Sequence, residues 1–429
     1  MACGAGRSGP HRCRGVVTRA EHRRDAVVGR FPLRDGAARR PRPRPARRQS
    51  HPTGRPGEQA IAKGAAMATT DTVTARAGSS RRAMLLGTLG FAAVAVAALA
   101  WAKWLPYAEK VPAVVGSHTV GTSIVNGDAS TPPAPSWQAA LDYALVYGRA
   151  IWPAMVAGLL LAASVEAFLP RRRLLSMFQR HRGPAVSTVA GGALSMPSMM
   201  CTCCAAPVAV SVRKRGVPLS SALAYWLGNP VLNPVVLVFM AVVLPWQFVT
   251  VRVITGAVLV FGVTMLIGRL VGARKAVTDP ALAPEYDSST PDAPASARDA
   301  ARRFLRTLVR LSAVLLPEYL IVVLLLGGLR GWLFPAGAAE WGLLAVLLFA
   351  VVGTLFVIPT AGEIPIIQGL ALAGVGLGPV GALILTLPAL SLPSMLMIRR
   401  AFPARVIAAT GVCVAVLGVV GAGLLVVLS

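Results

Sequence analysis

Charged residues are scarce in this sequence: only 14% of its 429 residues are charged, whereas 55% are hydrophobic. Soluble domains usually carry about a quarter charged residues. A single soluble domain could not hide this much apolar surface from water, so lipid must be part of the solvent. The composition therefore predicts a multi-pass protein of the plasma membrane.

Acidic residues are the scarcer of the two charge types, with 17 Asp and Glu against 43 Lys and Arg. A net charge of +26 would by itself suggest nucleic acid as a partner. However, 16 of the basic residues lie within residues 1–66, and the others form short clusters between apolar runs. This is the positive-inside pattern of membrane proteins, which predicts the lipid bilayer as the partner and no nucleic acid.

The sequence also lacks a Walker-type phosphate loop and a cluster of histidines. The first absence argues against ATP-driven pumping by this chain alone. The second leaves no histidine metal site. We therefore expect a transporter rather than an enzyme, with no cofactor and with a small ion or metalloid as substrate. The oligomeric state does not follow from the sequence.

The first 137 residues predict a tail, one transmembrane helix and a loop. Residues 1–80 are rich in Arg, Pro, Gly and Ala, which predicts a disordered basic tail. Translation from Met67 is an alternative start. Residues 81–137 predict a first transmembrane helix, Met84–Trp101, with its N-terminus inside, followed from residue 106 by an outer loop.

The rest of the chain divides at a polar segment, residues 272–305, which predicts a cytoplasmic linker. Before it lies a first permease repeat, residues 138–271, and after it a second repeat with a C-terminal helix, residues 306–429. The predicted spans are Leu145–Leu169, Leu219–Trp246, Thr250–Val271, Leu308–Leu329, Leu343–Ile358, Val380–Ile398 and Val406–Leu428, besides two broken stretches at residues 186–212 and 359–376.

The two repeats share the spacing of their helix-breaking residues. In the first, Pro207, Gly216 and Pro230 are separated by 9 and 14 residues, and the second repeats this spacing at an offset of 158 with Pro365, Gly374 and Pro388. The charge rule gives the halves opposite orientations. We therefore predict an all-α polytopic membrane protein of two inverted repeats with roughly seven to ten membrane segments.

Breaks in the apolar segments predict where a substrate passes. Residues 186–212 have basic residues on both flanks, which indicates a re-entrant hairpin. The span Leu219–Trp246 is expected to break at Gly228-Asn229-Pro230 and again at Asn233-Pro234. Irregular backbone at membrane depth is tolerated only inside protein or beside a watery cavity.

Cys201, Cys203 and Cys204 are the most distinctive cluster in the sequence, and they lie between Pro197 and Pro207. Thiolates are soft ligands that prefer Cu(I), zinc and other thiophilic species. The three cysteines therefore predict a site for one soft metal ion or metalloid. The alternative interpretation is that they are small apolar residues of a buried helix.

Polar residues beside the breaks complete the candidate set. Glu363 could bind a proton or balance a cation, or it could cap a helix N-terminus. Asn229 and Asn233 could offer amide oxygens to a cation or satisfy freed backbone groups. Thr202 and Thr360 occupy equivalent repeat positions and could line the path. The full set of candidate substrate-binding residues is Cys201, Thr202, Cys203, Cys204, Pro207, Asn229, Pro230, Asn233, Thr360, Glu363 and Pro365.

The segment from Cys201 to Pro207, with the basic cluster and Gly216 that follow and the later Asn229-Pro230, resembles a family of predicted permeases that includes the trivalent organoarsenical efflux permeases. The resemblance covers roughly residues 145–400 and implies a permease. Members often have proline where this chain has Met199, and glycine where it has Cys204. A third thiol can alter the substrate, so arsenical specificity is not carried over.

The leading hypothesis is a secondary permease in which the three cysteines bind a thiophilic species and Glu363 couples the step to protons, with export as the expected direction. The first alternative is a membrane thiol-disulfide oxidoreductase, in which Cys201 and either Cys203 or Cys204 cycle between dithiol and disulfide. The second alternative is a non-transporting membrane subunit, which leaves the matched helix breaks unexplained.

Overall fold

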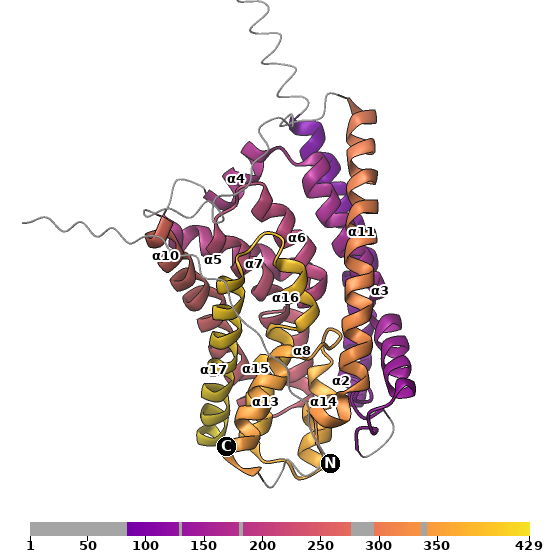
Figure 1. Ribbon diagram of the computed structural model, residues 1–429, viewed down its shortest axis with the longest axis vertical. Helices are drawn as coiled ribbons and strands as arrows, with labels where there is room; N and C mark the ends of the chain where they lie inside the picture. The colour runs from indigo at the N-terminus through magenta and orange to yellow at the C-terminus, as the bar shows by residue number, and fades with distance from the viewer. Residues whose placement is uncertain (1–83, 128–130, 180–182, 276–295, 336–340) are drawn as a thin grey trace, which may run out of the picture. The chain divides into compact units, whose positions relative to one another are not determined.

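The computed structural model of the protein describes residues 84–127, 131–179, 183–275, 296–335 and 341–429. The chain divides into two units, Met1–Ala66 and Met67–Ser429, and every described residue belongs to the second. The predicted disordered tail and the alternative start at Met67 therefore lie outside the described residues. The described residues are helical and contain no strand (Figure 1).

Seven helices of the described residues are long and apolar enough to cross a membrane. Large apolar side chains such as Leu320, Ile321 and Val420 are exposed on these helices, as they are where helices face lipid. The prediction of an all-α polytopic membrane protein is therefore confirmed. The seven are Met84–Ser117, Trp137–Phe168, Leu219–Val243, Trp246–Val271, Ala297–Gly328, Leu377–Ile398 and Ala404–Leu428.

The helices fall into an N-terminal helix and two matching series. The N-terminal helix, Met84–Ser117, contains the π-helical segment η1 (Ala100–Trp104) and ends in α2 (Leu105–Ser117). The first series is α3 (Trp137–Phe168), α4 (Arg171–Gln179), α5 (Pro184–Ser195), η2 (Met196–Ser198), α6 (Thr202–Lys214), α7 (Leu219–Val231), α8 (Pro234–Val243), α9 (Trp246–Ala257), η3 (Val258–Val263) and α10 (Thr264–Lys275). The second is α11 (Ala297–Gly328), α12 (Arg330–Leu333), α13 (Leu343–Leu355), α14 (Glu363–Leu372), α15 (Leu377–Ala389), α16 (Leu392–Ile398) and α17 (Ala404–Leu428).

Two pairs of corresponding helices in the two series have the same length, and several have the same end signals. Both α3 and α11 have 32 residues and a serine N-cap, and α7 and α15 both have 13 residues. After α6 and α14 the chain turns at Gly216 and Gly374, whose φ angles are +94° and +79°. The amide of the next residue then bonds back into the helix, from Val217 to Val212 and from Val375 to Leu370. Glycine is favoured at this left-handed position, so the equal spacing of the two glycines reflects equal helix ends.

The first long helices of the two series, α3 and α11, run in opposite directions. Near the end of α3, Glu166 lies 3.7 Å from Arg310, which is in the first half of α11. At the other end, Arg330 just after α11 donates to the carbonyl oxygen of Ala139 at the start of α3, at 2.6 Å. The two helices are therefore antiparallel neighbours (Figure 1), as an inverted repeat requires.

Three predicted boundaries were wrong. The first helix continues to Ser117, so the predicted outer loop is helical in its first part. Pro106 and Pro112 both lie inside this helix, which continues through them. Helix α10 reaches Lys275 and α11 begins at Ala297, which shortens the predicted linker at both ends. The break predicted at Gly228-Asn229-Pro230 is absent, since these three residues are helical in α7. The chain breaks at Leu232 and Asn233, and Asn233 caps α8.

Candidate transport site

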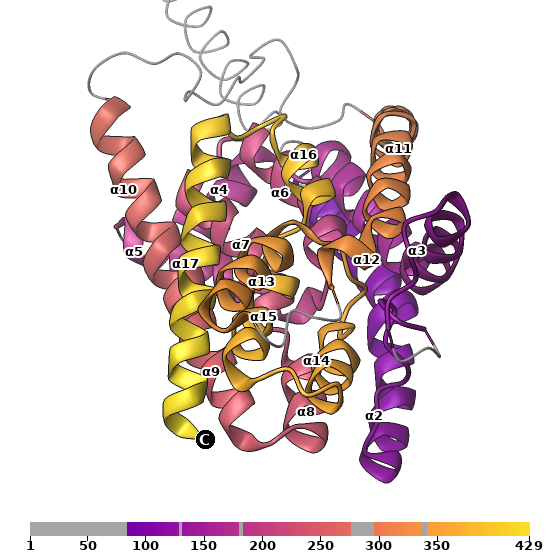
Figure 2. The ribbon, with the colours of Figure 1, turned by 60° about the horizontal axis from the view of Figure 1, so that its bottom comes forward.

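Each half contains a helical hairpin, α5–α6 with its tip at residues 196–201 and α13–α14 with its tip at residues 356–362. The two tips meet at a small cavity of about 10 Å³, which is room for about one water molecule. Figure 2 shows α15 of the second half next to α7 of the first, and α16 next to α6. The first half contributes Cys201, Thr202 and Pro230 to the lining, and the second contributes Thr360, Glu363, Pro388 and Ser391. Five of the candidate residues thus line one cavity, although Thr202 and Thr360 are 158 residues apart in the sequence.

The three thiols lie together at the start of α6. Cys201 precedes the helix in an extended conformation, and Cys203 and Cys204 occupy its first turn. The Cys201 sulfur is 3.0 Å from each of the other two, and all three sulfurs lie within 4.8 Å of one another. Among the described residues this is the one group of three or more His, Cys, Asp or Glu placed to hold a single ion. All three thiols are buried and free of disulfides.

Two tyrosines contact the thiol cluster, and the sequence reasoning missed both. The hydroxyl of Tyr319 on α11 donates to the Cys203 sulfur at 3.3 Å, and the hydroxyl of Tyr147 on α3 lies 3.6 Å from it. The two hydroxyls also bond to each other. A buried tyrosine hydroxyl needs a polar partner, so tyrosines in the middle of apolar spans were the available signal.

Glu363 has a buried cationic partner that the sequence reasoning also missed. The guanidinium of Arg252 on α9 lies 3.3 Å from the Glu363 carboxylate, and both side chains are almost completely buried. Arg252 also donates to the carbonyl oxygens of Pro230, Val231 and Ile384. It therefore connects the end of α7 in the first half with α14 and α15 in the second.

The asparagines serve the backbone. The side-chain oxygen of Asn229 accepts from the Met200 amide and the Ser198 hydroxyl, and so holds the turn before the thiols. Asn233 accepts from the amides of Val235 and Val236 at the start of α8. Both amide oxygens thus satisfy groups freed by the helix breaks. Neither residue lines the cavity, nor does Pro207, which lies buried inside α6.

Each hairpin tip also contains a residue with unusual backbone geometry. Met199, two residues before Cys201, has a φ angle of +49°, and Ala361, two residues before Glu363, has a φ angle of +68°. Side chains other than glycine seldom adopt this left-handed region, and such strained residues gather at functional sites. Equivalent strain in both halves indicates that the two tips are held in place by the helices around them.

The thiol helix lies unusually close to α3, and this contact gives a test. A methyl group added at Gly158 would lie 2.3 Å from the carbonyl oxygen of Cys204. We expect Gly158→Ala to push α6 outward, to cost about 1–3 kcal/mol of stability and to weaken binding of phenylarsine oxide by the thiols. Thermal unfolding and probe titration of the purified protein measure both effects.

Gly148→Ala is the matched control, because it lies on the same helix with nothing within 4 Å of the added methyl group. If the two variants behaved alike, the close approach of α3 and α6 would have no importance for the thiols.

The fold and the site together define a membrane permease: apolar spans in two inverted halves, broken where the halves meet. Residues 136–427 match the family described as "predicted permease", and the chain belongs to that family. The chain is also 44% identical over 338 residues to the UPF0718 protein YraQ of Escherichia coli (strain K12). The aligned residues make up 78% of this chain and 93% of that protein. No solved structure matches. The family resemblance inferred from the cysteine segment is thereby confirmed.

Proposed function

We propose that this permease is a secondary transporter of the plasma membrane that carries a small thiophilic metal ion or metalloid, with Cys201, Cys203 and Cys204 as its ligands. The observation that carries the proposal is the convergence of three buried sulfurs within 4.8 Å at the point where the two halves meet. Soft thiolate ligands favour Cu(I), zinc and similar species over hard cations such as magnesium.

The spacing of the sulfurs supports one bound ion. For ion–sulfur distances of about 2.3 Å, sulfur atoms around a single ion lie roughly 4 Å apart. Two of the sulfur pairs are at 3.0 Å, so Cys201 would need to move outward by only about 1 Å to reach that spacing. The ion would then sit against the cavity that Thr202 and Thr360 line.

Proton coupling through Glu363 is the finer part of the proposal. The carboxylate lines the cavity while it pairs with Arg252, so it stands between the substrate site and the helix ends that Arg252 holds. Protonation of Glu363 would remove the ion pair and free the guanidinium to rearrange with the backbone carbonyls. A proton on Glu363 would thus loosen the contact between the halves, which is the step that alternating access requires.

Uptake into inside-out membrane vesicles tests the proposal directly. The panel contains Cu(I), Zn(II), arsenite and methylated arsenicals, each with and without a proton gradient. We expect accumulation of at least one thiophilic species, increased by the gradient, in vesicles with the protein and not in vesicles without it. Equal accumulation of every species in vesicles with and without the protein would refute the proposed substrate class. An uptake rate that is the same with and without the proton gradient would refute proton coupling.

A further inference from the structure

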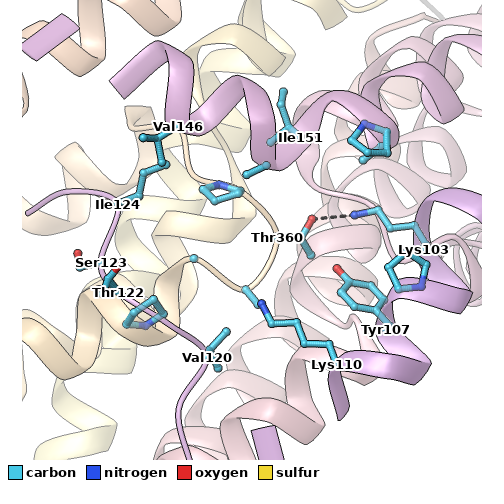
Figure 3. A pocket seen from close by; sticks show the side chains of 18 of the residues that line it. Lys103, Tyr107, Lys110, Val120, Thr122, Ser123, Ile124, Val146, Ile151 and Thr360 are labelled. Carbon is cyan, nitrogen blue, oxygen red and sulfur yellow. Dashed lines mark hydrogen bonds between the residues drawn. The ribbon is translucent and has the colours of Figure 1, made fainter. Parts of the chain in front are cut away.

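A second, much larger cavity of about 650 Å³ lies beside the thiol site, and we call it the vestibule. It is enclosed by the N-terminal helix, residues 120–127, α3 and the loop before α14. Figure 3 shows Lys103, Tyr107 and Lys110 approaching it from the N-terminal helix and Thr360 from the opposite side. Pro359 and Thr360 line both the vestibule and the thiol cavity, so the two spaces adjoin at these residues.

The vestibule is positively charged. Lys103, Lys110 and Arg330 line it, against a single acidic residue, Asp142. The Lys103 side chain is only 5% exposed. Within the described part of the chain, no carboxylate lies within ion-pair distance of its ammonium, which bonds the Thr360 hydroxyl, faces the Tyr107 ring and interacts electrostatically with the Cys201 and Cys204 thiols. A buried ammonium without a carboxylate partner is costly, so this ammonium favours an anion beside it.

Arg330 adds a second buried cation to the lining of the vestibule. Its Nη1 atom donates to backbone carbonyl oxygens of Ala139 and Gly327, which fixes the guanidinium beside the cavity. Guanidinium groups bind oxyanions better than other ligands. Hydroxyl groups of Thr122, Ser123 and Thr360 around the same cavity can donate to an oxyanion as well.

Lys103 belongs to a segment that contacts both hairpin tips. Its ammonium donates to the Thr360 hydroxyl at 3.0 Å, at the tip of the second hairpin. The next residue, Trp104, donates from its indole nitrogen to the carbonyl oxygen of Pro197 at 2.8 Å, at the tip of the first. Both residues lie in η1, and π-helical turns within α-helices are frequent at functional sites.

We propose that the vestibule is a binding site for a small oxyanion, with Lys103 and Arg330 as its principal ligands and Lys110 at its rim. When an oxyanion binds there, the ammonium of Lys103 pairs with it and gives up its hydrogen bond to the Thr360 hydroxyl. Thr360 is then free to move, and the passage from the vestibule to the thiol cavity widens. The site adjoins the thiol cluster but uses other ligands, so the proposal does not depend on which species the thiols bind.

Equilibrium binding of radiolabelled sulfate to the purified full-length protein tests the proposal, with total ionic strength held constant by chloride. We expect saturable binding that Lys103→Gln weakens by about tenfold or more, because a hydrogen bond to a charged group is lost. Lys110 is exposed, so Lys110→Gln leaves the fold intact and is expected to weaken binding by about threefold. Lys103→Arg keeps the charge and is expected to retain binding.

Lys214→Gln is the matched control, because it removes the same charge from an exposed position at the end of α6 that does not line the vestibule. The proposal is overturned by the absence of saturable sulfate binding, by Lys110→Gln and Lys103→Gln proteins that bind as the unchanged protein does, or by a loss that Lys214→Gln reproduces. Serine substitutions of the three cysteines should leave sulfate binding intact, which separates this site from the proposed transport site.

Discussion

Replacing Arg252 with methionine is expected to lower the thermal unfolding midpoint by on the order of 10 °C. The substitution leaves the Glu363 carboxylate buried without its cation and removes hydrogen bonds to three backbone carbonyl oxygens. Breaking a buried ion pair from one side typically costs about 3–5 kcal/mol. The midpoint is measured by heating samples of the protein in detergent to a series of temperatures. The monodisperse peak that remains at each temperature is then quantified by size-exclusion chromatography.

Arg269→Met provides the control, since Arg269 is an exposed arginine on α10, and its replacement should shift the midpoint little. Replacing both Arg252 and Glu363 with methionine should restore part of the lost stability, because no uncompensated charge remains. Equal midpoints for the Arg252→Met and Arg269→Met proteins would mean that Arg252 does not hold the two halves together.

Replacing Cys201 and Cys203 together with serine is expected to abolish transport while the protein remains in the membrane. Serine nearly preserves the size of the side chain, but its hard oxygen has little affinity for a soft ion. We expect a rate at least about tenfold lower for the species that the vesicle assay identifies, with unchanged protein in the membrane fraction. Binding of phenylarsine oxide to the purified protein should be lost in parallel.

Cys413→Ser is the control for this pair, because Cys413 lies on α17 and is not part of the thiol cluster. Undiminished transport by the double variant would exclude the thiol mechanism. The same proteins also test the oxidoreductase alternative, which the 3.0 Å separations of Cys201 from its two neighbours permit. Thiol trapping would then reveal a redox-dependent mobility shift in the unchanged protein, together with activity in the absence of substrate movement.

Features that depend on local sequence could be predicted, and the helix series is the main example. Apolar runs between basic clusters located the spans, and the matched spacing of Gly216 and Gly374 identified two halves. The glycine spacing was informative because each glycine occupies a left-handed turn that other residues avoid. Helix ends were less predictable: α2 tolerates Pro106 and Pro112, and α7 tolerates Pro230.

Partners distant in the sequence could not be predicted. Arg252 and Glu363 are 111 residues apart, and Lys103 and Thr360 are 257 residues apart. A lone arginine or lysine in an apolar span signals a functional or structural role, but the sequence does not show which residue it meets. Glu363 was accordingly interpreted without its cation, whereas the cysteines, being neighbours in the sequence, could be recognised as a cluster.

The N-terminal helix has no counterpart among the described elements of the second half. Two identical inverted halves would give inward-facing and outward-facing conformations of equal free energy. The contacts of Lys103 and Trp104 with the hairpin tips come from one flank of the bundle only, and they precede the residues that match the family. If the chain is a carrier as proposed, we expect this helix to favour one of its two orientations, so that a chain shortened to residues 136–427 would differ in directionality rather than in the chemistry of the cargo.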